Sequence, residues 1–146
     1  MPFWAPTIIP SWLINGTTVV PVSYPDGAGV ANPTFGANPW VYGNYVDIVA
    51  ANVLTAYTLD WLCAFSSDYE NLQIQIATGA AGFEIVIATL SFRWWNLSGA
   101  GVSPAIGHPF PAGLQIPANA RVAVRARGSI GGKDAAVYCT FYPRPK

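Results

Sequence analysis

From residue 45 onward, apolar and polar positions alternate in short runs. The alternation is clearest in residues 70–78, where Leu72, Ile74 and Ile76 are separated by Gln73 and Gln75. A period of two places the apolar side chains on one face of a β-strand and the polar ones on the other. Similar runs predict further strands at residues 53–65, 83–93, 114–117, 120–128 and 135–142.

The same alternation predicts which side chains face the core. In residues 120–128 we expect Val122, Val124 and Ala126 to point inward, and in residues 135–142 Val137, Cys139 and Phe141. Strict alternation in residues 53–65 groups on one face Val53, Thr55, Tyr57, Leu59, Trp61, Cys63 and Phe65. Buried faces that alternate with polar ones are typical of antiparallel sheets.

Glycine and proline divide these runs. The tetrapeptide from Gly79 to Gly82 separates two strands and predicts a β-hairpin. Residues 96–113, which contain four glycines and three prolines, are expected to form a loop. No stretch has a helical period, and many short strands with such turns indicate a sandwich or barrel. The expected fold is therefore all-β, a jelly-roll-like antiparallel β-sandwich.

The first 44 residues differ from the rest because they hold seven of the thirteen prolines. Proline has no amide proton for a central strand, yet a disordered tail would be more polar than this segment. We expect residues 1–44 to form an extended arm, with one or two short edge strands near 17–23, and residues 45–146 to form the sandwich. The apolar side chains expected to contact a neighbour are Phe3, Trp4, Trp12, Leu13 and Trp40.

Charge is scarce and balanced. Only 10% of residues are charged, with seven basic and seven acidic side chains. A neutral chain does not suit nucleic acid, and so few charges predict a surface covered by other subunits, hence a homo-oligomer. The most apolar stretch, residues 45–65, is interrupted by polar side chains, so no membrane span is expected. The first residues, with Pro2 and Pro6, do not resemble a signal peptide.

Few residues could carry catalysis. His108 is the one histidine and has no cysteine or carboxylate within twenty positions, so a loop histidine with a neighbouring hydrogen bond is the simpler interpretation. Cys63 and Cys139 lack metal-ligand spacing and are expected to be buried free thiols, with a disulfide as the alternative. Asp68 and Glu70 could bind calcium, but a solvated turn is the simpler interpretation. We expect no catalytic residue, cofactor or metal.

Two surface features have alternative interpretations. Arg121, Arg125 and Arg127 share one strand face and could dock an acidic neighbour or keep an edge strand soluble. Tyr42, Trp94 and Trp95, with Trp40 and Tyr45 nearby in sequence, could form an aromatic platform for a sugar ring or a neighbour's pocket. Alternatively, the N-terminal arm covers these rings.

Two sequence motifs resemble a known group of proteins. Residues 114–127, LQIPANARVAVRAR, are similar to the IPAGTRVAVRA strand of tailed-bacteriophage virion proteins, and residues 72–84, LQIQIATGAAGFE, to the EIQIATGAAGSE hairpin of the same group. With the last strand, the resemblance spans residues 45–142. It departs at Asn119, where a glycine is usual; asparagine tolerates the same left-handed turn.

The resemblance implies a capsid decoration (cement) protein or a related jelly-roll accessory protein. Such proteins assemble with trimeric or higher symmetry on a virion, so the expected partners are other copies of the chain, a trimer being favoured, and the major capsid protein or another virion protein. Assembly in the host cytoplasm would precede attachment to the virion. The alternative function is a carbohydrate-binding or receptor-binding module of a tail or fibre. An enzyme would require distant segments to bring His108 beside Cys63 or a carboxylate.

Overall fold

The computed structural model of the chain describes residues 13–14, 17–18, 22–25, 30–54, 57–65, 71–93 and 106–143. Ten strands lie in these residues: β1 (Leu13–Ile14), β2 (Thr17–Thr18), β3 (Val22–Tyr24), β4 (Val46–Val49), β5 (Tyr57–Phe65), β6 (Leu72–Thr78), β7 (Ile85–Phe92), β8 (Ile106–Ile116), β9 (Val122–Gly128) and β10 (Ala136–Pro143). The expected all-β fold is confirmed. No helix long and apolar enough to cross a membrane occurs in this part of the chain.

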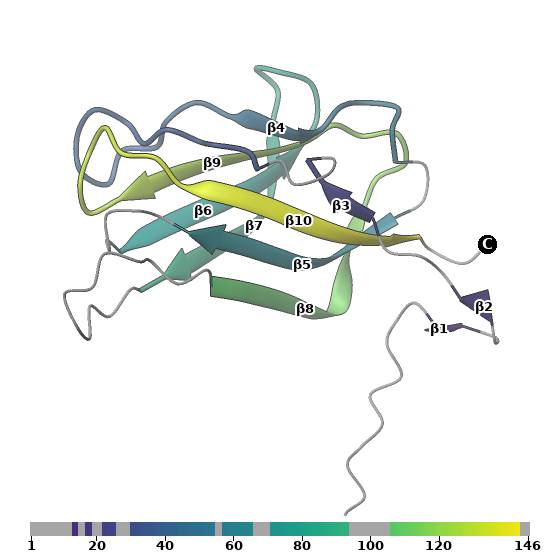
Figure 1. Cartoon of the computed structure of the whole chain (residues 1–146). Coiled ribbons are helices and arrows are strands. Elements are labelled where there is room, and N and C mark those ends of the chain that lie inside the picture. The colour runs from purple at the N-terminus through teal and green to yellow at the C-terminus, as the bar shows by residue number, and fades with distance from the viewer. Residues whose placement is uncertain are drawn as a thin grey trace, which may run out of the picture.

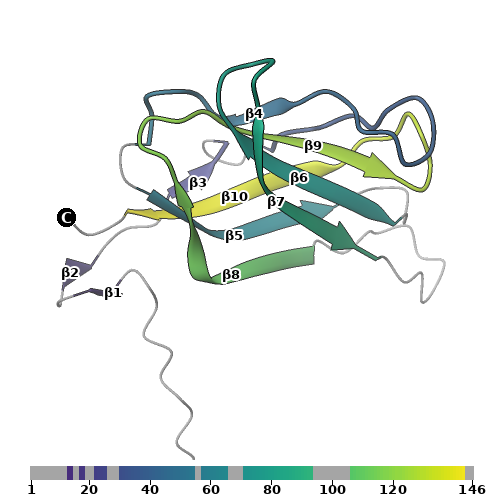
Figure 2. The same cartoon turned by 180° about the vertical axis from the view of Figure 1, so that it is seen from behind.

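Eight of the strands form two four-stranded antiparallel sheets that face each other (Figure 1). One sheet has the order β3-β10-β5-β8 and the other the order β4-β9-β6-β7; β1 and β2 pair separately. Consecutive strands from β3 to β10 change sheets at every step except the β6–β7 hairpin. This alternation between two sheets is the jelly-roll arrangement, and Figure 2 shows the β7 side of it from behind.

The core lies between the sheets and consists of the alternating positions that the sequence indicates. The side chains expected to point inward from β6, β9 and β10 are all buried: Leu72, Ile74, Ile76, Val122, Val124, Ala126, Val137, Cys139 and Phe141. The β6–β7 hairpin is also confirmed, with Leu72 opposite Phe92 and Thr78 opposite Ile85.

Strand β5 departs from strict alternation. Asp60 is an extra residue, because Leu59 and Trp61 pair with consecutive residues of β10, Phe141 and Thr140. This bulge moves the buried set by one position, so Leu59 and Leu62 both face the core while Trp61 remains exposed. The expectation that Leu59, Trp61 and Cys63 share one face is therefore wrong, since a single inserted residue reverses the faces after it.

Residues 106–113 are strand and not loop. Strand β8 contains Gly107, Pro109 and Pro111, which led us to expect a loop over residues 96–113. It lies at the edge of its sheet, where its neighbour in the sheet is β5. An edge strand has one side without ladder partners, so it tolerates residues that lack an amide proton.

The sandwich begins before residue 45. Strand β3 pairs with β10, with Ser23 opposite Thr140, and therefore belongs to the body. Ala31 and Phe35 are buried in the core, and Ala31 exchanges two backbone hydrogen bonds with Val137, at 2.8 Å each. The expected boundary between arm and sandwich at residue 45 is thus wrong. Segments without regular strand structure also form backbone hydrogen bonds to a strand and so belong to the sandwich. Phe3, Trp4 and Trp12 lie outside the described residues.

The turn before β9 contains Asn119, the position at which the virion-protein motif that the sequence resembles has a glycine. Asn119 has φ 60°, the left-handed conformation that the substitution requires. Its amide donates to the Leu54 carbonyl oxygen at 2.8 Å, and its own carbonyl accepts from the amide of Asn52 at 2.9 Å. Asn52 is left-handed too, with φ 65°.

Substituting Asn119 tests whether its left-handed backbone conformation determines which residues this turn tolerates. We expect Asn119→Gly to change the free energy of unfolding by less than about 0.5 kcal/mol, because glycine adopts this conformation freely. Asn119→Val should lower it by about 1–2 kcal/mol, since the left-handed region costs a side chain with a branched Cβ about that much. Urea denaturation measures both. Equal losses for glycine and valine would contradict the conformational explanation.

Candidate functional site

The segment from Trp40 to Tyr45 lies along β9. The Trp40 amide donates to the Gly128 carbonyl oxygen at 2.7 Å, and the Gly43 amide to that of Ala126 at 3.1 Å. These bonds continue the β4–β9 ladder on the N-terminal side of Val46, the first residue of β4. They bring the side chains of residues 40–45 over the outward face of β9, where Arg125 and Arg127 stand.

The aromatic rings of this segment and the two guanidinium groups alternate in a stack, which we call the cation–π ladder (Trp40, Arg127, Tyr42, Arg125, Tyr45). The Arg127 Cζ lies 6.0 Å from the centroid of the Trp40 ring and 4.5 Å from that of Tyr42. The Arg125 Cζ lies 4.6 Å from the centroids of both Tyr42 and Tyr45. Each such contact stabilises by roughly 0.5–2 kcal/mol, depending on how dry it is.

Two rows of polar side chains extend the ladder across the sheet. Arg127 Nε donates to Gln73 Oε1 at 2.9 Å, and Gln73 Nε2 donates to Ser91 Oγ at 3.1 Å. In the next row, Arg125 Nε donates to Gln75 Oε1 at 2.8 Å, and Gln75 Nε2 donates to Thr89 Oγ1 at 3.4 Å. The rows follow the strand register of β9, β6 and β7. We call these six side chains the polar grid.

Tyr42 ties the ladder to the grid. Its hydroxyl donates to Gln73 Oε1 at 2.5 Å, so this oxygen accepts from both Tyr42 and Arg127. Burial raises the pKa of Tyr42, and this effect outweighs the opposing charges of Arg127 and Arg125. The phenol therefore stays protonated at neutral pH and keeps its donor role.

Trp40 has an unusual backbone. Its φ is 61°, in the left-handed region that a bulky side chain rarely adopts. The surroundings hold it there: its amide bonds to Gly128, and its carbonyl oxygen accepts from Arg127 Nη1 at 3.2 Å. Nevertheless Trp40 is 47% exposed. Strain of this kind costs of order 1–3 kcal/mol and concentrates at functional positions.

Arg121 has a different role from the other two arginines. It forms ion pairs with Asp47 at 2.6 Å and with Glu84 at 3.0 Å, and it donates to the Gly79 carbonyl oxygen at 3.3 Å. These contacts join the start of β9 to β4 and to the base of the β6–β7 hairpin. The three arginines therefore do not form one docking stripe. The alternative, protection of an edge strand, is also wrong, because β9 lies between β4 and β6.

Strand β7 and Phe83, two residues before it, carry exposed apolar side chains. Phe83, Ile85 and Val86 are 81%, 68% and 41% exposed, and we call them the β7 strip. The strip lies at the start of the strand that ends the order β4-β9-β6-β7, and the hairpin turn before it projects from the sandwich in both views (Figures 1 and 2). Our sequence prediction missed this strip because Phe83–Ile87 contains consecutive apolar residues and no alternation that assigns their exposure.

The outward face of the other sheet is aromatic. Trp61 is 40% exposed, and its indole lies so close over Gly107 that a Cβ there would come within 1.9 Å of Trp61 Cζ2. Tyr138 and Tyr142 are half-buried on the outward side of β10. We call Trp61, Tyr138 and Tyr142 the aromatic face.

Both cysteines are buried free thiols, as expected, so the disulfide alternative is wrong. Cys63 is opposite Tyr138 in the ladder, and its hydrogen bond raises the pKa of that phenol. Burial raises the pKa of Cys139, so its thiol stays protonated. His108 pairs with Leu62 in β8 and β5, so it faces the side of the sheet opposite Cys63.

His108 does not form a catalytic pair in the described part of the molecule. Its Nδ1 is buried without a hydrogen-bond partner, and its ring centroid lies 5.2 Å from that of Phe110. The expectation that His108 is a loop histidine with a hydrogen bond to a neighbour is therefore wrong for its Nδ1. Nor do the described residues contain a group of three or more side chains that could hold a metal ion.

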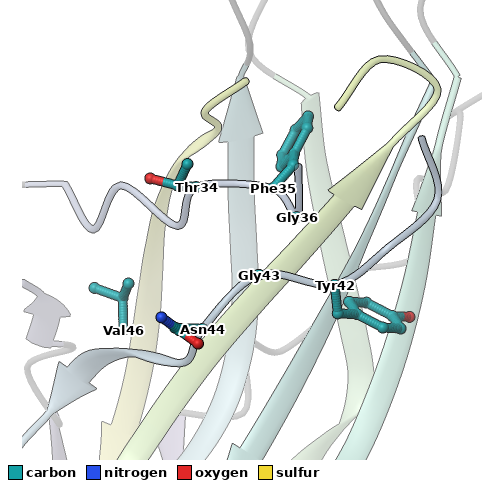
Figure 3. A pocket seen from close by; sticks show the side chains of 7 residues that line it. All are labelled: Thr34, Phe35, Gly36, Tyr42, Gly43, Asn44 and Val46. Carbon is teal, nitrogen blue, oxygen red and sulfur yellow. The ribbon is translucent and has the colours of Figure 1, made fainter. Parts of the chain in front are cut away.

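A hollow of about 480 Å³ lies beside the ladder, between residues 34–36 and 42–46. Figure 3 shows that its lining side chains diverge: Phe35 and Tyr42 point in different directions, and Gly43 lies between them. Phe35 is part of the buried core. The hollow therefore offers mostly backbone and no converging set of chemical groups.

The structure thus joins two features that the sequence suggested separately. Tyr42 of the expected platform contacts Arg125 and Arg127 of the expected basic stripe. Trp94 and Trp95, the other members of that platform, lie outside the described residues, as do Asp68 and Glu70. Leu13 lies in β1, opposite Thr18 of β2.

The ion pair of Arg121 predicts a pH dependence of stability. Hydrogen bonds from its own backbone amide, from Arg121 and from the Gly82 amide together hold the pKa of Glu84 below its usual 4.5 against the opposing effect of burial. Because the folded pKa is depressed, this stabilisation is present above about pH 4.5 and is lost as pH falls through the folded pKa. Between pH 5 and pH 3 we expect the Tm of the Glu84→Gln variant to fall by less than the Tm of the native chain. Equal falls in Tm would contradict a stabilising role of the Glu84 carboxylate.

No protein-family model matches the chain, and no curated protein matches its sequence. Among solved structures, it is similar to Eiger TNF from S. frugiperda, with a TM-score of 0.50 and 8% identity over 88% of this chain and 94% of that one. At this identity the likeness concerns the fold alone. The chain is therefore an antiparallel β-sandwich of the jelly-roll type.

Proposed function

We propose that this chain is a non-enzymatic structural protein of a virion, which attaches to the capsid as an oligomer and stabilises it through contacts between subunits. The observation that carries the proposal is the β7 strip. Phe83 and Ile85 expose most of their side chains at the edge of a sheet, in a chain with 10% charged residues. Isolated apolar residues are normal on a surface, but several exposed apolar side chains close together at the start of an edge strand are typical of a contact with another chain.

The aromatic face supplies a second apolar surface, on the other sheet. Interfaces between proteins are enriched in Trp and Tyr and poor in charged residues. Trp61, Tyr138 and Tyr142 fit this composition. The β7 strip and the aromatic face differ in composition, so the contact we propose is head to tail, between one strip and one aromatic face. Such a contact closes into a ring when the rotation between subunits allows it, and a trimer is the state that we favour.

The virion assignment rests on the sequence resemblance to bacteriophage decoration and accessory proteins. The two motifs that carry the resemblance correspond to the β6–β7 hairpin and to β9, which are neighbours through β6. Their likeness to virion proteins therefore concerns one contiguous part of the sheet, and it includes the hairpin that precedes the β7 strip. The contacts that the sequence predicts for Phe3, Trp4 and Trp12 would add area to the attachment.

The mass in solution tests the assembly. We expect the native chain to show a multiple of its 15.5 kDa by light scattering, and the double variant Phe83→Ser/Ile85→Thr to show a single 15.5 kDa mass with an unchanged circular dichroism spectrum. The control is Val53→Thr, because Val53 is 45% exposed outside the strip. A native chain that stays monomeric at millimolar concentration contradicts the proposal.

The head-to-tail geometry predicts complementation between two variants. Trp61→Ser should also be monomeric, because it damages the aromatic face but leaves the β7 strip intact. Mixed in equal amounts, Trp61→Ser and Phe83→Ser/Ile85→Thr retain one undamaged contact between them, so we expect particles of twice the 15.5 kDa mass. A contact between two β7 strips would instead leave Trp61→Ser dimeric on its own, so it is excluded if Trp61→Ser alone is monomeric and the doubled mass appears only in the mixture.

The place in the virion needs a separate measurement. An antibody raised against the purified chain should label intact particles of the virus that encodes it, and the chain should be present in a fixed ratio to the major capsid protein. Labelling of host structures only, with none on particles, overturns the virion assignment without affecting the assembly result.

A further inference from the structure

We propose that the cation–π ladder and the polar grid form a binding site for a carboxylated oligosaccharide, such as one that contains uronic or sialic acid. The site lies on the outward face of β9, β6 and β7. It is distinct from the β7 strip and the aromatic face, so it does not depend on the assembly proposed above.

The charges of the site are not balanced within the described part of the molecule. The ion pairs found there belong to Arg121, and neither Arg125 nor Arg127 has a carboxylate within salt-bridge distance. Each guanidinium is nevertheless held rigidly between aromatic rings and by its Nε bond to a glutamine. Two cations that have no carboxylate of the described residues at salt-bridge distance complement an anionic ligand.

The hydrogen bonds of the grid run in one direction. Each arginine donates to a glutamine oxygen, and each glutamine amide donates to a hydroxyl oxygen, of Ser91 or Thr89. The hydroxyl protons of Ser91 and Thr89 are left to donate outward, and both residues are exposed. Gln73 Oε1 already accepts two bonds. The grid therefore presents mainly donors, which match the acceptor oxygens of a carboxylate.

The unused guanidinium protons can reach a ligand. Arg125 uses Nε and Arg127 uses Nε and Nη1 in the bonds described above. Arg125 and Arg127 are both partly exposed, so their side chains are not fully enclosed by the protein. They provide the two-pronged donor that carboxylates prefer.

Trp40 favours a sugar over an acidic peptide. Its indole is about half exposed at the end of the ladder, and aromatic faces stack on the C–H face of a sugar ring. By the usual strand spacings, the grid measures about 10 Å by 7 Å, which is the size of one or two sugar rings. The left-handed backbone of Trp40 adds a reason, because such strain is kept where a side chain's placement matters.

Calorimetric titration of the full chain with tetragalacturonic acid and with its uncharged methyl ester tests the proposal directly. A hyaluronan tetrasaccharide and sialyllactose are titrated alongside. We expect at least one carboxylated oligosaccharide to bind, the acid at least tenfold more tightly than a neutral counterpart, and its affinity to fall as salt is raised, since ion pairs are screened.

Two matched tryptophan variants separate binding from structure and from assembly. Trp40→Asn removes an exposed indole but suits the left-handed backbone, so we expect an unchanged or higher Tm and at least a tenfold loss of affinity. Trp61→Ser removes an indole of similar exposure from the other sheet, so it should bind the oligosaccharide normally while failing to assemble.

Three results overturn the proposal: equal affinity for an acid and its ester, no binding of any of the three carboxylated oligosaccharides at millimolar concentration, or tighter binding of a glutamate-rich peptide than of any sugar. Full binding by a folded Trp40→Asn variant overturns the assignment of Trp40. Because the β7-strip variants keep the ladder and the grid, failure of assembly and failure of glycan binding are distinguishable.

Discussion

The structure depends on the packing of two four-stranded sheets against each other, which buries one face of β5, β6, β9 and β10. This packing fixes the position of each side chain, because neighbouring residues on a strand point to opposite sides. Ile74 and Ile76 are inside because they alternate with Gln73 and Gln75, and for the same reason the glutamines must lie outside. The outward faces are thus defined by the core, and the cation–π ladder, the polar grid and the aromatic face lie on them.

The outward faces of the two sheets differ chemically. One carries the cation–π ladder and the polar grid, in which fixed arginines, glutamines and hydroxyls form a connected network. The other carries Trp61, Tyr138 and Tyr142 with few charges. A chain with seven basic residues concentrates Arg121, Arg125 and Arg127 on one strand and uses them in two ways. Arg121 forms ion pairs with Asp47 and Glu84 and so joins the start of β9 to the β6–β7 hairpin. Arg125 and Arg127 are instead held between aromatic rings.

This division allows one small domain to combine assembly with recognition. The proposed contacts between subunits use the edge of β7 and the aromatic face, and the proposed glycan site uses the centre of the other sheet. A decoration protein that also holds an acidic sugar would display the site on the particle surface in several copies. Weak individual sites are then combined by multivalency, which raises the overall affinity without new contacts.

The sequence by itself determined the elements with regular alternation. Strands β6, β9 and β10, the β6–β7 hairpin, the inward side chains and the left-handed turn at Asn119 all follow from local preferences. The sequence did not determine where alternation breaks or where proline is tolerated. The bulge at Asp60 and the prolines of β8 depend on which strands are neighbours and which lies at an edge.

Only the tertiary structure brought Trp40, Tyr42 and Tyr45 onto Arg125 and Arg127. Eighty or more positions separate them along the chain, and the pairing depends on the register of residues 40–45 against β9. The same holds for the pairing of Arg121 with Asp47 and Glu84, and for the exposure of Phe83 and Ile85. Contacts of this kind are set by the order of strands in the sheets, which a local pattern of apolar and polar residues does not specify.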